Sequence, residues 1–359
     1  NTWGAYQCYG DPFYKLVKVS AASDKAAPEY LIAQEAEIDL NNLISDLDTG
    51  SADVPYALRK VQMIADAVKK ADIQNSGTAE NEAFIYAEIG DYENAIKKFE
   101  DLFKMENAQF SVLALEKYCN LSTRVCVSGY LSSAVQGKTN WAEQLNTIIG
   151  RLDYLLLISP TAERYCLLGS AYKRRAIITS GVQRKASLKA AAFYYYMATK
   201  KAAEPSVYAV TNWFQMEAVI RLNDKQPWNL KETVTVSKNL FVPDADTAMK
   251  KSYELISREE AIETLARLQA TINKPLQNMD YWQLVSGANI ALCQLVMSRK
   301  ADKEAWGSLL ETYKRVWKKS GSVAKRKTEL EHLEALYSVL LHKSVLKDNL
   351  IKLEEQLEK

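Results

Sequence analysis

Residues 80–103, ENEAFIYAEIGDYENAIKKFEDLF, decide the fold class of this sequence. The first half carries an apolar stripe at helical spacing, formed by Ala83, Tyr86 and Ile89. Gly90 can end that helix in a left-handed conformation, and Asp91 can cap the next helix. The second half carries a facing stripe, formed by Tyr92, Ala95, Ile96 and Phe99. The stretch therefore predicts two helices that are joined by a tight turn and packed face to face.

The segment YCLLGSAYKR, residues 165–174, gives a second signal of the same kind. Its bulky-Leu-Gly-Tyr spacing resembles the first helix of a tetratricopeptide (TPR) repeat, and residues 80–103 also resemble a TPR unit. The positions that carry the spacing are Tyr165, Leu168, Gly169 and Tyr172. The partner helix would carry Ala191, Tyr195 and Ala198, with Pro205 where the repeat ends. The long connection TSGVQRK, residues 179–185, predicts an extended repeat.

The composition favours helices along the whole chain. Only 13 Gly and 8 Pro occur, and nearly all of the prolines separate amphipathic stretches. Helices are predicted at 29–47, 54–72, 78–89, 92–104, 108–132, 140–158, 161–179, 184–202, 206–221, 245–256, 258–273, 279–299, 302–319, 323–342 and 344–358. Because a TPR hairpin cannot bury its apolar face alone, such hairpins stack. The predicted fold is all-α: a TPR-like helical-hairpin superhelix, or α-solenoid, with a short non-helical N-terminal tail.

The chain divides into four predicted segments. They are a terminal strand or tail of an upstream domain at 1–27, TPR-like repeats at 28–222, an irregular linker or loop at 223–244, and a C-terminal helical block with capping helices at 245–359. A plain amphipathic bundle explains the stretches 108–158 and 206–256 nearly as well as degenerate repeats do. The last helices read as a capping pair rather than a coiled coil, because clean heptads are not sustained.

Charge and cysteine content exclude several classes of function. A net charge of +2, from 46 basic and 44 acidic residues, gives no global attraction to nucleic acid or anionic lipid. The five cysteines contain no CxxC pair, which argues against a disulfide framework and against a zinc site. No apolar run approaches the roughly 20 residues that span a bilayer. We expect a cytoplasmic protein without membrane partners, and nucleic acid is not an expected partner.

No pattern predicts a catalytic residue, a metal site or a cofactor. The two histidines, His332 and His342, lie on a late helical segment that we expect to be exposed, with no companion nucleophile. Metal and phosphate signatures such as HExxH and GxxxxGK[ST] are absent. Surface recognition remains as the expected role.

The spacing from Tyr165 predicts a polar groove wall. In the first helix of a TPR unit, the residues two before, one after, five after and eight after this position line the concave face. These are Glu163, Cys166, Ser170 and Lys173, with Arg174 beside them. A basic cluster of Arg164, Lys173, Arg174, Arg175, Arg184, Lys185 and Lys189 could hold an acidic peptide or a phosphorylated small molecule. An ordinary solvated helix face with ion pairs explains the same residues.

Aromatic residues cluster in the neighbouring segment. Tyr194, Tyr195, Tyr196, Tyr208, Trp213 and Phe214 could form a stacking pocket, although aromatic residues at helical spacing more often form core. Trp213 would face the groove if Tyr208 starts the next repeat. The candidate residues for binding a ligand or partner are Glu163, Arg164, Ser170, Tyr172, Lys173, Arg174, Tyr208 and Trp213. A second basic run, residues 314–327, could meet a partner or nucleic acid, but we interpret it as a charged turn between helices with its lysines in solvent.

Two segments resemble one known arrangement. WGAYQCYGDPFYKL, residues 3–16, is similar to the end of CHAT domains, which have a caspase-like peptidase fold. SPTAERYCLLGSAYKR, residues 159–174, is similar to a motif in the helical region that follows CHAT domains in many bacterial proteins. That region looks like the TPR sensor-type module and is also similar to the TRAF-binding region of apoptosis signal-regulating kinases.

The resemblance implies that a His and Cys dyad lies upstream and that this helical region regulates the peptidase. It carries over to Glu163, Arg164, Gly169, Ser170, Tyr172, Lys173 and Arg174. Two functions stay open: a scaffold that binds a protein or peptide in its concave groove, and a sensor that binds a small molecule, phosphorylated or nucleotide-derived, around residues 163–213. Accessible Ser170 and Lys173 in an open groove favour the scaffold, whereas an enclosed pocket lined by Arg and Tyr favours the sensor. Oligomerisation through the C-terminal helices is a third hypothesis.

Overall fold

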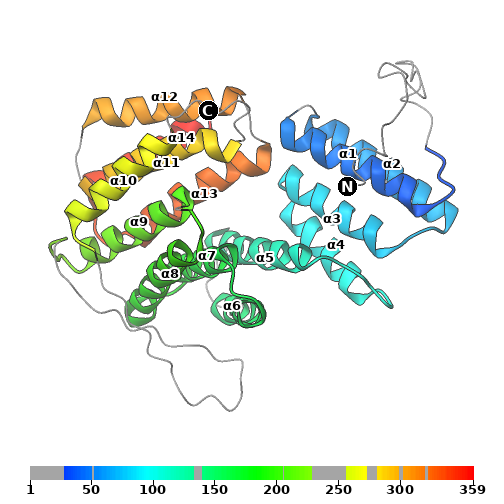
Figure 1. Ribbon diagram of the computed structural model, residues 1–359, viewed down its shortest axis with the longest axis horizontal. Helices are drawn as coiled ribbons and strands as arrows, with labels where there is room; N and C mark the ends of the chain where they lie inside the picture. Colours follow the sequence, from blue (N-terminus) through cyan, green and yellow to red (C-terminus); the bar gives the residue numbers. More distant parts are fainter. Residues whose placement is uncertain are drawn as a thin grey trace, which may run out of the picture.

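The structure is a computed structural model, and it describes residues 28–50, 52–132, 140–204, 206–228, 256–272, 281–298, 302–319 and 322–359. Fourteen helices and no strand occur within these residues, so the predicted all-α helical-repeat solenoid is confirmed. Helices α1–α4 form one end of the molecule, and α5–α9 form a curved row that leads to the C-terminal helices at the other end (Figure 1). None of the helices in the described part is both long and apolar enough to cross a membrane.

The first four helices are two hairpins. They are α1 (Ala33–Thr49), α2 (Val54–Ala71), α3 (Ser76–Ile89) and α4 (Tyr92–Lys104). The turn between α3 and α4 is built as the sequence predicts: Gly90 has a φ of 87°, and the Asp91 side chain accepts a hydrogen bond from the backbone N–H of Asn94. Helices α1–α3 enclose a small core of their own, and α3 also contributes Ala83 and Ala87 to the larger core that continues through α4.

The middle helices are α5 (Val112–Ser132), α6 (Trp141–Ile158), α7 (Ala162–Ile178), α8 (Gly181–Lys201) and α9 (Val207–Asn223). Helices α7 and α8 approach closely at Gly169, where an added Cβ would lie 2.9 Å from ring atoms of Tyr195. The predicted extended connection at 179–185 is wrong. Helix α8 begins at Gly181, directly after Ser180, whose side chain makes no capping hydrogen bond, so only Thr179 and Ser180 separate it from α7 and the extra residues lengthen the helix.

The C-terminal helices fold back onto the repeats. They are α10 (Arg258–Ile272), α11 (Tyr281–Ser298), α12 (Lys303–Lys319), α13 (Val323–Val339) and α14 (Val345–Leu357). Helix α11 packs on α9, and α13 packs on α14 and also on α3 and α7. One cluster of buried apolar side chains continues from the repeats into α14, so these helices share the main core. The chain therefore brings α13 back to helices that lie more than a hundred residues earlier.

Most predicted helix boundaries agree with the structure to within four residues, as at 92–104 and 54–71. The helix predicted at 245–256, the N-terminal tail at 1–27 and most of the linker at 223–244 lie outside the described residues. The division of the chain into domains stays a prediction.

Candidate functional site

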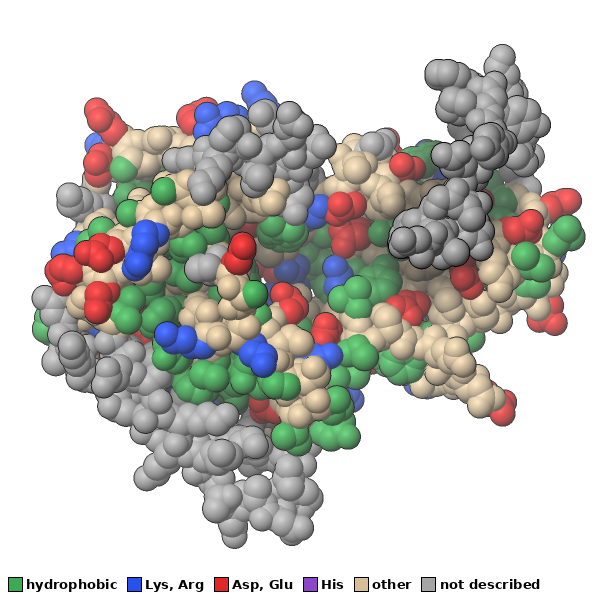
Figure 2. Space-filling view, in the orientation of Figure 1, with side chains coloured by type: hydrophobic (Ala, Val, Ile, Leu, Met, Phe, Trp, Pro, Cys, Tyr) green, Lys and Arg blue, Asp and Glu red, His purple; other side chains and the backbone are tan. Residues whose placement is uncertain are grey.

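A large cavity lies where the repeats meet α13. Its volume is about 1420 Å³, and most of its lining residues lie on α3, α4, α5, α7, α9, α11 and α13. Figure 2 shows a hollow near the centre of one face, with Lys and Arg side chains inside it and acidic side chains beside them. The cavity therefore joins residues from the repeats with residues from the C-terminal helices.

The groove positions counted from Tyr165 all line this cavity. They are Glu163, Cys166, Ser170 and Lys173, with Arg174 next to them, and Tyr208 lines it as well. These residues therefore share one cavity wall, while their role in binding stays a prediction. Ser170 and Lys173 are buried, with 6% and 5% of their surface exposed, which is the condition that favours a pocket over an open groove.

Lys173 is held by neutral partners. Its Nζ donates to Asn212 Oδ1 at 2.9 Å and lies 2.9 Å from His332 Nδ1. Burial and the neighbouring Arg174 lower the pKa of Lys173 to about 7. Burial, together with Lys173 and Arg174, also lowers the pKa of His332 well below its usual value, so a neutral imidazole can accept the proton of Lys173.

Two guanidinium groups stand beside Lys173. Arg174 Nη1 donates to Asn120 Oδ1, Thr123 Oγ1 and Ser170 Oγ at 3.1, 3.0 and 2.9 Å. Arg124, on α5, donates to the Tyr92 hydroxyl at 2.6 Å and to Thr328 Oγ1 at 2.8 Å. These acceptors are uncharged, so they orient the guanidinium groups without neutralising them.

A single carboxylate on α13 lies between the two arginines. Oε2 of Glu331 is 3.3 Å from Arg124 Nε and 3.9 Å from Arg174 Nη2. The Nε–H of Arg124 is buried and makes no hydrogen bond, so the contact at 3.3 Å is an ion pair without hydrogen-bond geometry. Burial and the nearby Arg124 lower the pKa of Arg174, whereas Glu331 and Tyr92 raise the pKa of Arg124 despite its burial, so the carboxylate compensates Arg124 better than it compensates Arg174.

The other acidic residues around the cavity compensate this charge only weakly. Glu329 is buried, and desolvation raises its pKa to about 7, so it is only partly ionised at neutral pH. Glu93, Glu163 and Glu204 are exposed, and Asp48 pairs with Lys325. The buried wall of the cavity is therefore cationic, while exposed side chains supply much of its acidic character.

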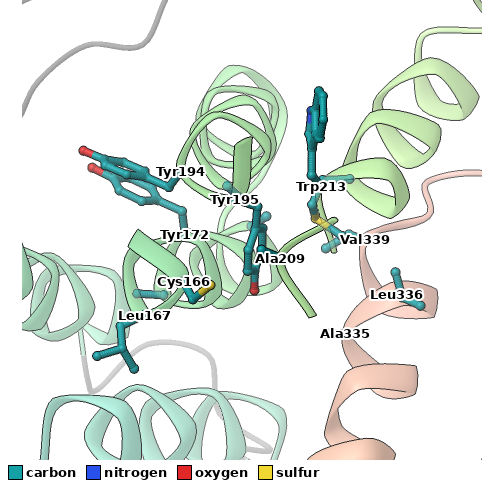
Figure 3. Close-up of a cluster of buried hydrophobic side chains, with 14 of the residues drawn as sticks. Cys166, Leu167, Tyr172, Tyr194, Tyr195, Ala209, Trp213, Ala335, Leu336 and Val339 are labelled. Atoms are coloured by element: carbon teal, nitrogen blue, oxygen red, sulfur yellow. The ribbon is translucent and has the colours of Figure 1, made fainter. Parts of the chain in front are cut away.

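Three of the candidate residues do not line the cavity. Arg164 is buried against Glu116, at 2.6 Å, and donates to the carbonyls of Leu155 and Ser159. The Tyr172 ring stacks on Tyr194 at 5.4 Å between centroids, as Figure 3 shows. Trp213 lies in the core rather than on the groove wall, because it is 6% exposed and its ring contacts Tyr196 and Phe214. Their polar or aromatic chemistry serves packing.

The predicted basic cluster is divided between several places. Arg175 donates to Asn146 and Ser187, Arg184 donates to the carbonyl of Thr179, and Lys185 pairs with Asp224. Lys173 and Arg174 are the members of the cluster that line the cavity. The second basic run was also interpreted incorrectly in part: Lys325 and Lys327 line the cavity, and Lys327 Nζ lies 4.1 Å from the centroid of the Tyr92 ring.

His332 was expected to be exposed and unpaired, and that expectation is wrong. It is partly buried and pairs with Lys173, because α13 returns to α7. Cys166 also lines the cavity, yet burial and Glu163 raise the pKa of its thiol, whereas a thiolate nucleophile needs the pKa lowered.

Arg124, Asn120, Asn212, Glu331 and His332 belong to the site but were not singled out from the sequence as site residues. The offset rule that located Glu163 to Lys173 works within one repeat, and Arg124 lies in a degenerate helix without the signature. Glu331 and His332 join the site only through tertiary packing.

Residues 91–217 match a family model described as Tetratricopeptide Repeats-Sensor. This part of the chain is similar to TPR sensor regions. The match begins at the cap of α4 and ends within α9, so it includes Arg124, Lys173 and Arg174 and stops before α13. A comparison with curated proteins found no match.

Proposed function

We propose that this TPR sensor region binds a small phosphorylated or nucleotide-derived molecule in the central cavity. The observation that carries the proposal is the group of three largely buried basic side chains, Arg124, Lys173 and Arg174, in one cavity wall, where Lys173 is partly protonated at neutral pH. Buried charges are costly unless they are paired, and strongly shifted groups in a cavity often mark functional sites. An anionic ligand supplies the negative charge that the wall lacks.

Tyr208 supports the nucleotide-derived alternative within this class. It lines the cavity and remains 40% exposed, in contrast to the buried Tyr194 and Tyr195 of α8. An accessible ring next to cationic groups can stack on a base while the cations hold a phosphoryl group.

The same resemblance that points to a sensor extends the proposal to regulation. Occupancy of the cavity would be passed to a caspase-like CHAT peptidase upstream in the same protein. In a chain that carries such a domain, the bound nucleotide should change the rate at which a reporter peptide is cleaved.

Binding is tested by thermal unfolding and calorimetry on the 359-residue chain. The probes are pyrophosphate, AMP and ADP, with adenosine as the uncharged control. We expect a saturable rise in melting temperature with at least one phosphorylated probe and none with adenosine, because ligand at about 100 times Kd adds about 2.7 kcal/mol to the free energy of unfolding.

Two variants locate the binding. Arg174→Gln should remove the response, whereas Arg175→Gln, on the same helix but bonded to Asn146 and Ser187, should keep it. Equal responses in both variants, or no response to any phosphorylated probe, contradict the proposal.

A protein or peptide partner is a second candidate. The cavity volume of about 1420 Å³ exceeds the roughly 300–1,000 Å³ of ordinary small-molecule pockets, so an extended acidic peptide could occupy it. A Glu-rich decapeptide that stabilises the chain where pyrophosphate, AMP and ADP do not would favour this candidate.

A further inference from the structure

The contacts of Arg124 and Arg174 differ in kind from those of a structural ion pair. Each guanidinium is already oriented by uncharged acceptors: the Tyr92 hydroxyl and Thr328 for Arg124, and Asn120, Thr123 and Ser170 for Arg174. Most of these acceptors belong to the repeats. The two positive groups are therefore positioned even when the carboxylate between them is absent.

Glu331 neutralises the charges of Arg124 and Arg174 only in part. One oxygen, Oε2, meets both arginines at 3.3 and 3.9 Å, and neither contact is a hydrogen bond to the carboxylate. The side chain of Arg124 is 9% exposed and that of Arg174 is 12% exposed, while that of Glu331 is 25% exposed. Two guanidinium groups facing one carboxylate leave an excess positive charge, and the carboxylate has a route to solvent.

We propose that Arg124 and Arg174 form the phosphoryl subsite of the cavity, and that Glu331 occupies this subsite until a ligand's doubly charged oxyanion replaces it. Guanidinium groups bind phosphoryl oxygens in bidentate geometry, and two of them match a dianion better than they match a single carboxylate. The inference rests on the proposed function, because it names the group of the ligand that enters and the residue that leaves.

The exchange has a consequence for α13. Glu331 lies on this helix between Thr328, which accepts from Arg124, and His332, which meets Lys173. These polar contacts link α13 to α5 and α7, whereas its apolar residues join the core shared with α14. Removing Glu331 from the arginines therefore weakens the contact of α13 with the repeats and leaves its packing on α14 in place.

The test uses inorganic pyrophosphate as the probe and two matched variants of α13. Glu331→Gln removes the charge with little change in shape. Glu334→Gln makes the same change on the same helix at a cavity residue that has no ion pair with Arg124 or Arg174. We expect Glu331→Gln to tighten the Kd for pyrophosphate about tenfold in calorimetry, which equals about 1.4 kcal/mol, and Glu334→Gln to leave it within about twofold.

Hydrogen exchange of residues 323–339 gives a second measurement that works in the unmodified chain. Pyrophosphate should speed amide exchange in α13 of the wild type, and Glu331→Gln should show faster exchange without the probe. Unchanged affinity in Glu331→Gln, or exchange in α13 that slows on binding, overturns the inference while the wild type still binds pyrophosphate. Absence of binding to both wild type and Glu331→Gln, with no response to AMP or ADP, overturns the proposed function instead.

Discussion

Substitution of Gly169 by Ala tests the packing that places the cavity wall. A Cβ at this position would lie 2.9 Å from Cγ and Cδ2 of Tyr195, whereas carbon atoms in contact usually lie about 3.5–4.0 Å apart. Tyr195 is completely buried, so its ring has no free space into which to move. Helices α7 and α8 would have to separate, and overpacking of this kind costs about 1–3 kcal/mol.

The gain in helix propensity opposes that cost. Replacing Gly by Ala within a helix contributes up to about 1 kcal/mol, so we expect Gly169→Ala to lower the free energy of unfolding by about 1–2 kcal/mol. Gly307→Ala is the matched control: Gly307 is exposed on the solvent face of α12, and a Cβ there meets nothing within 4 Å. This variant should be stabilised by up to about 1 kcal/mol.

Urea denaturation followed by far-UV circular dichroism measures both variants under the same conditions. The reasoning is refuted if Gly169→Ala is as stable as Gly307→Ala, because the close approach of α7 and α8 would then not limit the size of the side chain at residue 169. Gly169→Leu should be less stable than Gly169→Ala, since a larger side chain meets the same buried ring.

Two further predictions address the cavity and its neighbouring core. Burial and Arg174 lower the pKa of Lys173 to about 7, so between about pH 7 and pH 10 the unfolded chain binds one more proton at this residue than the folded chain does. As the pH rises through this range, the free energy of unfolding of the wild type should therefore rise relative to that of Lys173→Met, by up to about 1.4 kcal/mol per pH unit. Urea titrations at several pH values check this, and parallel pH profiles would contradict it. Trp213→Ala should cost about 3–5 kcal/mol of stability, because it empties a buried core position. Tyr208→Ala should cost much less stability but weaken ADP binding in calorimetry. If Tyr208→Ala were the more destabilising of the two substitutions, Trp213 would not be the core residue and Tyr208 would not be the cavity residue.

Local sequence chemistry accounts for most of the fold. Gly90 and Asp91 build the predicted turn, and the signature around Tyr165 sets the register that directs Ser170 and Lys173 to the cavity. Such features depend on residues within one hairpin, where spacing determines which side chains share a face. The connection before α8 was predicted to be too long because the pattern of Gly181 and its polar neighbours is typical of a loop, whereas these residues form the first turn of α8.

The site could be predicted only in part, because several of its residues lie on α13, a helix far along the sequence that folds back onto the repeats. Trp213 and Tyr208 have similar sequence surroundings, yet only Tyr208 lines the cavity, since neighbouring aromatic side chains enclose Trp213. Glu331 and His332 follow no motif at all. Their roles come from the packing of α13 on α3 and α7, a contact that no periodicity within either segment specifies.

The origin of the charges suggests how the two parts of the chain depend on each other. The three basic side chains of the wall come from α5 and α7, within the residues that match the family model, while Glu329 and Glu331 come from α13, beyond them. An anion that binds the wall and a helix that neutralises the wall compete for the same positive charge, so each must weaken the other by the same free energy. Truncation after residue 322 should therefore raise the affinity for pyrophosphate if the remaining helices stay folded. Glu331→Gln removes only the charge that competes with the anion and leaves the packing of α13 on α14 in place. This substitution, rather than truncation, therefore measures the coupling free energy between anion binding and the contact of α13 with the wall.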